Sequence, residues 1–249
     1  MNVSNPETGR EDELGGLNGA LQPVRAGAVL WSHGFFKGIL DRSTTATRDT
    51  LRMALWHPDN SATFENFKTT SRLKGLRLKP GHVQRSQEWM GGTGDWQPDK
   101  YAEEYKHQGT NWSDGDCYKY VEGLSWLYGS LEPSDKRASI KSELDDLVPL
   151  IAAAQDEDGY LNTQIQILDK NRWITRIHHE DYNLGHLLTA AVVHYSATGE
   201  SGMLEIATKA ADNAYDHFII RQRDAGYFGW NPTHIPGLVD LYRATCDLA

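Results

Sequence analysis

The chain has 249 residues, of which 39% are hydrophobic and 24% charged, and its formal net charge is −9. Such values fit a globular protein of one large or two small domains, and the acidic balance excludes bulk neutralisation of nucleic-acid phosphates. Two cysteines cannot build a disulfide framework, and no apolar run is long enough to cross a bilayer, so the sequence predicts a cytoplasmic protein with neither nucleic-acid nor membrane partners.

The N-terminal half shows few clear elements. Residues 1–24 are polar and predict a flexible arm, whereas residues 25–40, "RAGAVLWSHGFFKGIL", favour one or two short strands. Weak helical periodicity over 41–67 is interrupted at "HPDN". Residues 71–112 are rich in Gly, Pro and Trp and predict a long irregular connection, which is often functional.

Five helices are predicted after this connection. The first begins near Asp114, the second follows "EPSD" and contains Pro149, and the third covers residues 178–199. The fourth follows directly, and the fifth begins near Pro236. A faint repeat relates "HYSATGE" to "LYRATCD", 47 residues later. Repeated helical hairpins closed in a ring form an α/α toroid, so we predict a mainly α fold of this type.

The third helix, "HHEDYNLGHLLTAAVVHYSATG", has two different faces. One face is a continuous apolar stripe made of Leu184, Leu187, Leu188, Ala191, Val192 and Tyr195. The other carries His179, Tyr182 and His186 near the helix start. This division fits an inner helix of a toroid, packed against outer helices on one side and facing a central cavity on the other.

The histidines on this helix allow three interpretations. His179 and His186 are seven residues apart and point the same way, so they could hold a metal or hydrogen-bond a substrate as neutral imidazoles. The spacing is not that of the H-E-x-x-H zinc motif, and no third ligand is near, so metal binding is not expected. A satisfied core histidine is the simpler alternative for His186.

Carboxylates gather at two helix starts. Glu180 and Asp181 are favoured there by the helix dipole, and Asp114 is a natural N-cap. Asp116 is followed by a lysine and a glutamate three and six residues later. On a buried face this charged trio needs partners or a ligand, and on a solvated face it forms ordinary helix ion pairs.

The loop "DEDGYLNTQ" offers Tyr160, Asn162 and Gln164, whose aromatic and amide groups could contact sugar hydroxyls. Turn formation alone explains Gly159 in the same loop. Neither Cys117 nor Cys246 has an activating base or metal-site spacing, so neither is expected to be a nucleophile.

Four segments, found in order, resemble glycoside hydrolase family 127, the β-L-arabinofuranosidase-like enzymes: "DGDCYKYVEGLSW", "LIAAAQDEDGYLNT", "HEDYNLGHLLTAAVVHYSATG" and "HIPGLVDLYRAT". "FENFK" is a weaker match upstream. The resemblance implies a catalytic (α/α)6 toroid followed by β-sandwich domains. It also implies retaining hydrolysis of terminal L-arabinofuranosides or related plant sugars. The implied nucleophile is a cysteine held on zinc, with a separate glutamate as general acid.

The resemblance implies that His179 and His234 contact the substrate, and we expect Glu180, Asp116 and Tyr160 to support them. The family's pocket-shaping run is matched by Asp116, Tyr118, Lys119 and Glu122. The zinc ligands, the nucleophile and the acid match no residue here, so the catalytic residues are unknown and no metal ligand is assigned.

Family members are much longer than this chain. We therefore expect residues 25–249 to be the N-terminal part of the toroid, an incomplete ring, with 1–24 as an arm. We expect the isolated chain to be inactive and marginally stable, because an open ring exposes the inner faces of its helices. The alternatives are a truncated, non-catalytic carbohydrate-binding protein, or another toroid enzyme such as a sugar epimerase or an unsaturated glucuronyl hydrolase. Assembly into a homo-oligomer is left open.

Overall fold

The structure is a computed structural model that describes residues 27–57, 59–77, 107–221 and 231–245. All regular elements in these residues are helical, which confirms the predicted mainly α class. The α-helices are α1 (Gly34–Arg42), α2 (Arg48–Trp56), α3 (Thr63–Arg77), α4 (Ser113–Gly129), α5 (Asp135–Ala154), α6 (Thr163–Leu168), α7 (Glu180–Thr198), α8 (Gly202–Tyr215) and α9 (His234–Thr245). The arm 1–24, most of the irregular connection and Cys246 lie outside the described residues.

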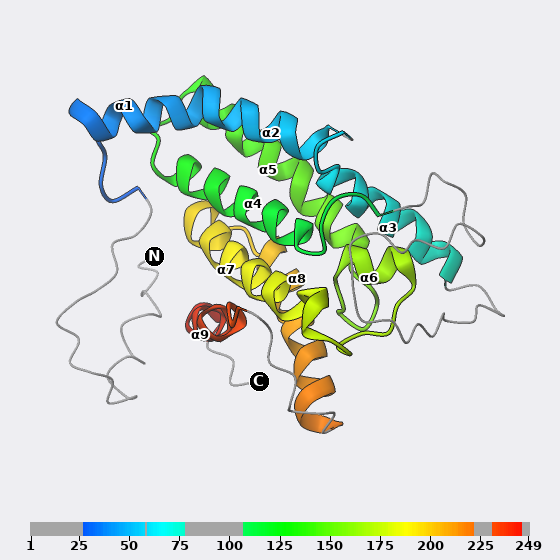
Figure 1. The fold of residues 1–249 in the computed structure, drawn as a ribbon. Coiled ribbons are helices and arrows are strands. Elements are labelled where there is room, and N and C mark those ends of the chain that lie inside the picture. The colour runs from blue at the N-terminus through cyan, green and yellow to red at the C-terminus, as the bar shows by residue number, and fades with distance from the viewer. Residues whose placement is uncertain (1–26, 58, 78–106, 222–230, 246–249) are drawn as a thin grey trace, which may run out of the picture.

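The strand predicted for residues 25–40 is wrong over its described part. Residues 27–33 form no strand, and Gly34 opens helix α1 with a φ of +83°. The aromatic and aliphatic side chains from Phe35 to Leu40 recur at helical rather than alternating spacing. A π-helical turn, η2 (Ser43–Thr47), joins α1 to α2 in one line (Figure 1). The break predicted at "HPDN" is confirmed, since α2 ends just before it.

The helix starts predicted for the second half are confirmed. Helix α4 begins one residue before Asp114, and α9 begins two residues before Pro236. Ser134 caps α5 by accepting a hydrogen bond from the Arg137 N–H at 3.3 Å. Pro149 lies inside α5, which continues to Ala154. Local sequence signals therefore set these helices before any packing is considered.

The helices of this second half form two layers. Helices α4, α7 and α9 lie side by side, with α7 in the middle, while α5 and α8 contact each other behind them (Figure 1). The α7 stripe is buried in the shared core at Leu184, Leu187, Leu188 and Ala191, although Tyr195 is 40% exposed. Apart from the short helix α6, successive helices from α4 to α9 alternate between these two layers, as a segment of an α/α toroid requires. Closure into a ring stays a prediction.

Two glycines bring α7 and α9 into close contact. A Cβ on Gly185 would lie 2.2 Å from the Thr233 carbonyl carbon and 2.4 Å from the His234 nitrogen. A Cβ on Gly237 would lie 2.9 Å from the Gly185 oxygen. Only glycine at both positions allows the two backbones to approach this closely.

Asp114 does not cap α4, which corrects the sequence prediction. It lies inside the helix, fully buried, and accepts hydrogen bonds from the Thr163 N–H at 2.6 Å and the Thr163 hydroxyl at 2.5 Å. The N-cap position of α4 is Trp112. Asp114 thus ties α4 to α6, a short helix that sequence reasoning treated as a loop. Burial raises its pKa from 3.8 to about 6, against the opposing effect of the Thr163 bonds.

Replacing Asp114 with asparagine is expected to remove a pH dependence of stability. Because its pKa is raised on folding, the native chain binds this proton more tightly than the unfolded chain does. This contribution to stability is present below about pH 4 and is lost as pH rises to about 6, by about 3 kcal/mol in total. Asparagine can keep both contacts with Thr163 without ionising, since its oxygen accepts from the N–H and its amide donates to the hydroxyl.

Urea unfolding of both proteins from pH 4 to pH 7 tests this, with the difference between them isolating Asp114 from other titrations. The free energy of unfolding of Asp114→Asn, relative to that of the parent, should increase as pH rises through about pH 5. Parallel pH profiles for the two proteins would contradict the assignment.

Candidate functional site

Ring and charged side chains from α4 and α7 meet around Tyr182. We call Trp112, Asp116, Lys119, His179, Tyr182 and His186 the Tyr182 cluster. Lys119 Nζ donates to the Tyr182 hydroxyl at 2.9 Å and pairs with Asp116 at 2.9 Å. The Tyr182 ring is edge-on to His186 at 4.6 Å and to His179 at 5.9 Å between centroids. The cluster therefore unites Asp116 and His179, two of the five predicted site residues.

His179 has a strained and well-defined conformation. It precedes α7 with φ +53° and ψ +29°, a left-handed geometry that is uncommon for a residue with a side chain. Its Nδ1 lies 2.8 Å from the carbonyl oxygen of Ile177. Because a carbonyl oxygen can only accept, Nδ1 carries the proton, and a neutral His179 presents Nε2 as a hydrogen-bond acceptor. The Trp112 ring, 40% exposed, lies 5.2 Å from the imidazole.

His186 lies further along α7, and its surroundings favour the neutral imidazole. Burial lowers its pKa, and Lys119 acts in the same direction while Asp116 opposes both. For Lys119, burial acts to lower the pKa, but hydrogen bonds to Tyr182 and Asp116 outweigh it and raise the pKa. A neutral imidazole beside a cationic amine can donate to or accept from a hydroxyl-rich ligand.

His234 reaches the same region from α9. Its Nδ1 lies 3.8 Å from a carboxylate oxygen of Asp181, and its side chain is 30% exposed. The neighbouring Thr233 hydroxyl donates to the Tyr182 carbonyl oxygen at 3.0 Å. Tyr182 therefore contacts both segments: its carbonyl oxygen binds Thr233, next to His234, and its ring packs against His179.

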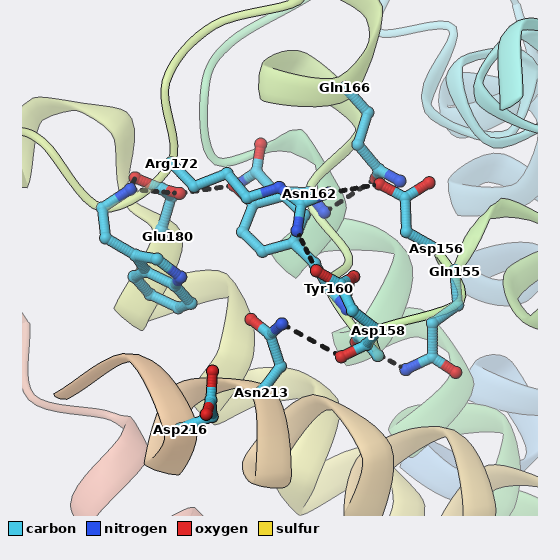
Figure 2. A network of polar contacts seen from close by, with 12 residues as sticks. Gln155, Asp156, Asp158, Tyr160, Asn162, Gln166, Arg172, Glu180, Asn213 and Asp216 are labelled. Carbon is cyan, nitrogen blue, oxygen red and sulfur yellow. Dashed lines mark hydrogen bonds and ion pairs between the residues drawn. The ribbon is translucent and has the colours of Figure 1, made fainter. Parts of the chain in front are cut away.

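The other two predicted site residues contact each other instead. Tyr160 donates its hydroxyl proton to Glu180, whose two oxygens also accept from the Trp173 N–H at 3.0 and 2.8 Å (Figure 2). Tyr160 and Glu180 are both 2% exposed. Burial, reinforced by the Glu180 charge, raises the pKa of Tyr160 well above its ordinary value. Contact of either residue with a sugar stays a prediction, and their burial favours a structural role.

Further contacts hold the loop around Tyr160 in place (Figure 2). The Arg172 guanidinium lies 3.9 Å from the Tyr160 ring centroid and pairs with Asp156 and Asp158 at 2.6 and 2.5 Å. The Gln155 amide donates to backbone carbonyls of Gly159 and Ile206, both at 2.8 Å. The loop predicted to contact a sugar is therefore held by the flanking residues Gln155 and Arg172 and by a connection to α8.

Sequence reasoning missed Trp112 and the partnership of Asp181 with His234. The only sequence signal for Trp112 was its place directly before the predicted helix start. Asp181 was explained by the helix dipole alone, and a partner 53 residues away in α9 could not be inferred from the pattern of one helix.

In the part of the chain that the structure describes, no three His, Cys, Asp or Glu side chains converge as metal ligands. Cys117 is buried in the core, and burial raises the pKa of its thiol well above the ordinary value, so it is unsuited to act as a thiolate. No described helix is both long and apolar enough to span a bilayer.

Known proteins show what the chain is similar to. The model of the β-L-arabinofuranosidase catalytic domain of glycoside hydrolase family 127 matches residues 31–249. The non-reducing end β-L-arabinofuranosidase of Bifidobacterium longum subsp. longum is 36% identical over 110 residues, which cover 42% of this chain and 16% of that protein.

Two solved structures are similar over most of this chain. One is a family 127 β-L-arabinofuranosidase from Geobacillus stearothermophilus T6, with a TM-score of 0.64, 25% identity, and coverage of 86% of this chain and 29% of that one. The other is a family 127 β-arabinofuranosidase, with a TM-score of 0.62, 26% identity, and coverage of 90% and 32%. The chain spans only 16 to 32% of the length of these relatives.

The helical fold and these matches place the chain among the glycoside hydrolase families. It belongs to family 127, through the catalytic domain of the β-L-arabinofuranosidases, which confirms the resemblance found in its sequence motifs.

Proposed function

We propose that this chain supplies part of the sugar-binding surface of a glycoside hydrolase that acts on terminal L-arabinofuranosides or related plant sugars. Family membership and the names of its relatives support the substrate class. The observation that carries the proposal is the Tyr182 cluster, where His179, held in a fixed orientation by Ile177, lies beside the exposed face of Trp112. Aromatic faces and hydrogen-bonding groups of fixed orientation are the two features that sugar recognition needs.

In this proposal the residues of the chain bind and orient the sugar. The Nε2 atoms of His179 and His234 accept hydrogen bonds from two sugar hydroxyls, and Trp112 packs against the apolar face of the ring. Lys119 and Asp116 fix the Tyr182 ring from the α4 side. Fixed contacts of this kind place the glycosidic bond for reaction, which is worth several kcal/mol of the barrier in enzymes generally.

The zinc implied by the resemblance does not fit the described residues. They contain no group of three potential ligands, and the Cys117 thiol is buried in the core with a raised pKa. No part of the proposed binding involves zinc, and a retaining mechanism with a zinc-held cysteine, encoded beyond this chain, stays a prediction.

We also propose that this chain forms an incomplete ring, because it spans only 16 to 32% of the length of its relatives. Apolar side chains stay exposed on α9, at Ile235, Leu238 and Val239, with exposed fractions of 41 to 57%. Further helices of a longer protein would cover such side chains.

Titration of the 249-residue chain with L-arabinose, followed by amide NMR, tests the proposal. We expect shifts in α4 and at the starts of α7 and α9, and a loss of affinity of about tenfold or more in His179→Ala, the cost of one or two hydrogen bonds. His57→Ala, which removes an exposed histidine from another face, is the matched control and should bind like the parent.

Shifts with a uronate but not with L-arabinose would favour the glucuronyl hydrolase alternative. The absence of shifts with both sugars would contradict the binding proposal. Hydrolysis of an aryl β-L-arabinofuranoside by this chain alone would contradict the expectation that it is inactive.

A further inference from the structure

Asp181 is a buried carboxylate with an unusual lack of partners. It lies in the first turn of α7, its side chain is 8% exposed, and neither oxygen accepts a hydrogen bond from any described residue. Burial raises the pKa of Asp181, although the backbone N–H groups of Tyr182 and Asp181 and the nearby His234 act to lower it. These N–H groups do not meet the carboxylate oxygens in hydrogen-bond geometry. A buried carboxylate without partners costs several kcal/mol, so such a group normally has a specific role.

The nearest complementary group is the imidazole of His234. Its Nδ1 is also buried and without a hydrogen bond in the described part of the chain, and it lies 3.8 Å from the Asp181 oxygen. Each atom is therefore the natural partner of the other, and closing the gap by about 1 Å makes an ordinary hydrogen bond. The tight contact of α9 with Gly185 and the bond from Thr233 to the Tyr182 carbonyl fix the backbone on both sides of this pair.

The chemistry of the pair dictates which nitrogen holds the proton. An ionised carboxylate can only accept, so a bond to it requires a proton on Nδ1 of His234. The Ile177 carbonyl imposes the same requirement on Nδ1 of His179. His179 before α7 and His234 at the start of α9 then both carry the proton on Nδ1, which leaves Nε2 as the acceptor atom of each ring.

We propose that Asp181 is a positioning residue that keeps a proton on Nδ1 of His234 and so presents Nε2 to the ligand. The part of this inference that concerns the ligand rests on the proposed function. Two neutral imidazoles that each offer Nε2 as an acceptor select a ligand with two hydroxyl donors, such as the vicinal diol of a furanose. Asp181 acts through His234 and need not touch the sugar.

The tautomer of His234 in the 249-residue chain is the direct test. Two-bond ¹H–¹⁵N spectra at about pH 9, where an ordinary imidazole is neutral, distinguish a protonated from an unprotonated ring nitrogen. His234→Gln assigns the signal. We expect Nδ1–H in the parent. We expect the same in Asp181→Asn, whose amide oxygen still accepts, and a majority of Nε2–H in Asp181→Leu, which is similar in size but has no acceptor.

Asp240→Asn removes a carboxylate from the same helix α9, where it pairs with Arg243 on the surface, and should leave the tautomer unchanged. Amide spectra of α9 check that Asp181→Leu keeps the helix docked. If these spectra show that α9 detaches in Asp181→Leu, the parent and Asp181→Asn still test the proposal. A proton on Nε2 of His234 in either of these two proteins overturns it. A majority of Nδ1–H in a docked Asp181→Leu also overturns it.

Binding of L-arabinose separates this inference from the proposed function. If the tautomers behave as expected and L-arabinose binds about tenfold more weakly to Asp181→Leu than to Asp181→Asn, both are supported. If the tautomers behave as expected but neither the parent nor any variant binds L-arabinose, the positioning of His234 stands and the sugar-binding proposal fails.

Discussion

Replacing Gly185 with alanine is expected to detach α9 from α7. Alanine is normally favoured over glycine inside a helix by about 1 kcal/mol. Here the new Cβ would lie 2.2 and 2.4 Å from backbone atoms of Thr233 and His234, which cannot rotate away as a side chain can. Overpacking of this kind costs about 3 kcal/mol or more, so the steric term outweighs helix propensity and α9 must move.

Hydrogen exchange measures this result directly. Amides of α9 should lose protection in Gly185→Ala, while those of α4 and α5 keep it. Gly123→Ala in α4 is the matched control, because a Cβ there meets nothing within 4 Å and the change should stabilise the chain by up to about 1 kcal/mol. Unchanged protection of α9 in Gly185→Ala would show that the α7–α9 contact is looser than described.

Removing the Glu180 side chain is expected to destabilise the fold by about 3–5 kcal/mol. Glu180→Ala leaves the buried Tyr160 hydroxyl and the Trp173 N–H without an acceptor, and it opens a cavity beneath the start of α7. Glu180→Gln keeps one acceptor oxygen and should cost less. Urea unfolding at neutral pH compares the three proteins.

The control for this prediction is Glu205→Ala on α8, an exposed glutamate whose loss should change stability by less than about 1 kcal/mol. A stable Glu180→Ala protein that binds L-arabinose more weakly would support the prediction that Glu180 contacts the substrate. A large loss of stability would assign Glu180 to the framework of the site.

The helices of the second half could be predicted because their signals are local. Apolar spacing and the Ser134 cap act within one helix, and they need no knowledge of neighbouring segments. The one or two strands predicted for residues 25–40 failed over their described part for a related reason, since a short apolar run fits a helix or a strand equally well. Packing decides such cases, and packing is not visible in a window of ten residues.

The candidate site could be predicted only in part, because it depends on contacts between distant segments. His179 and Asp116 were found from their positions on helix faces, and they do meet around Tyr182. Tyr160 and Glu180 were chosen for the same polar chemistry, yet each satisfies the other in the interior. A sequence shows that a hydroxyl and a carboxylate are present, but not that they are hydrogen-bonded to each other in the folded chain.

Glu180 and His179 are consecutive residues with different surroundings. The first is locked beneath α7 by Tyr160 and Trp173, and the second stands at the entry of the same helix with its ring already held by Ile177. The imidazole therefore has little freedom left to lose when a ligand arrives. Preorganisation of this kind lowers the entropic cost of association, which in the proposed function favours binding of even a small sugar with few contacts.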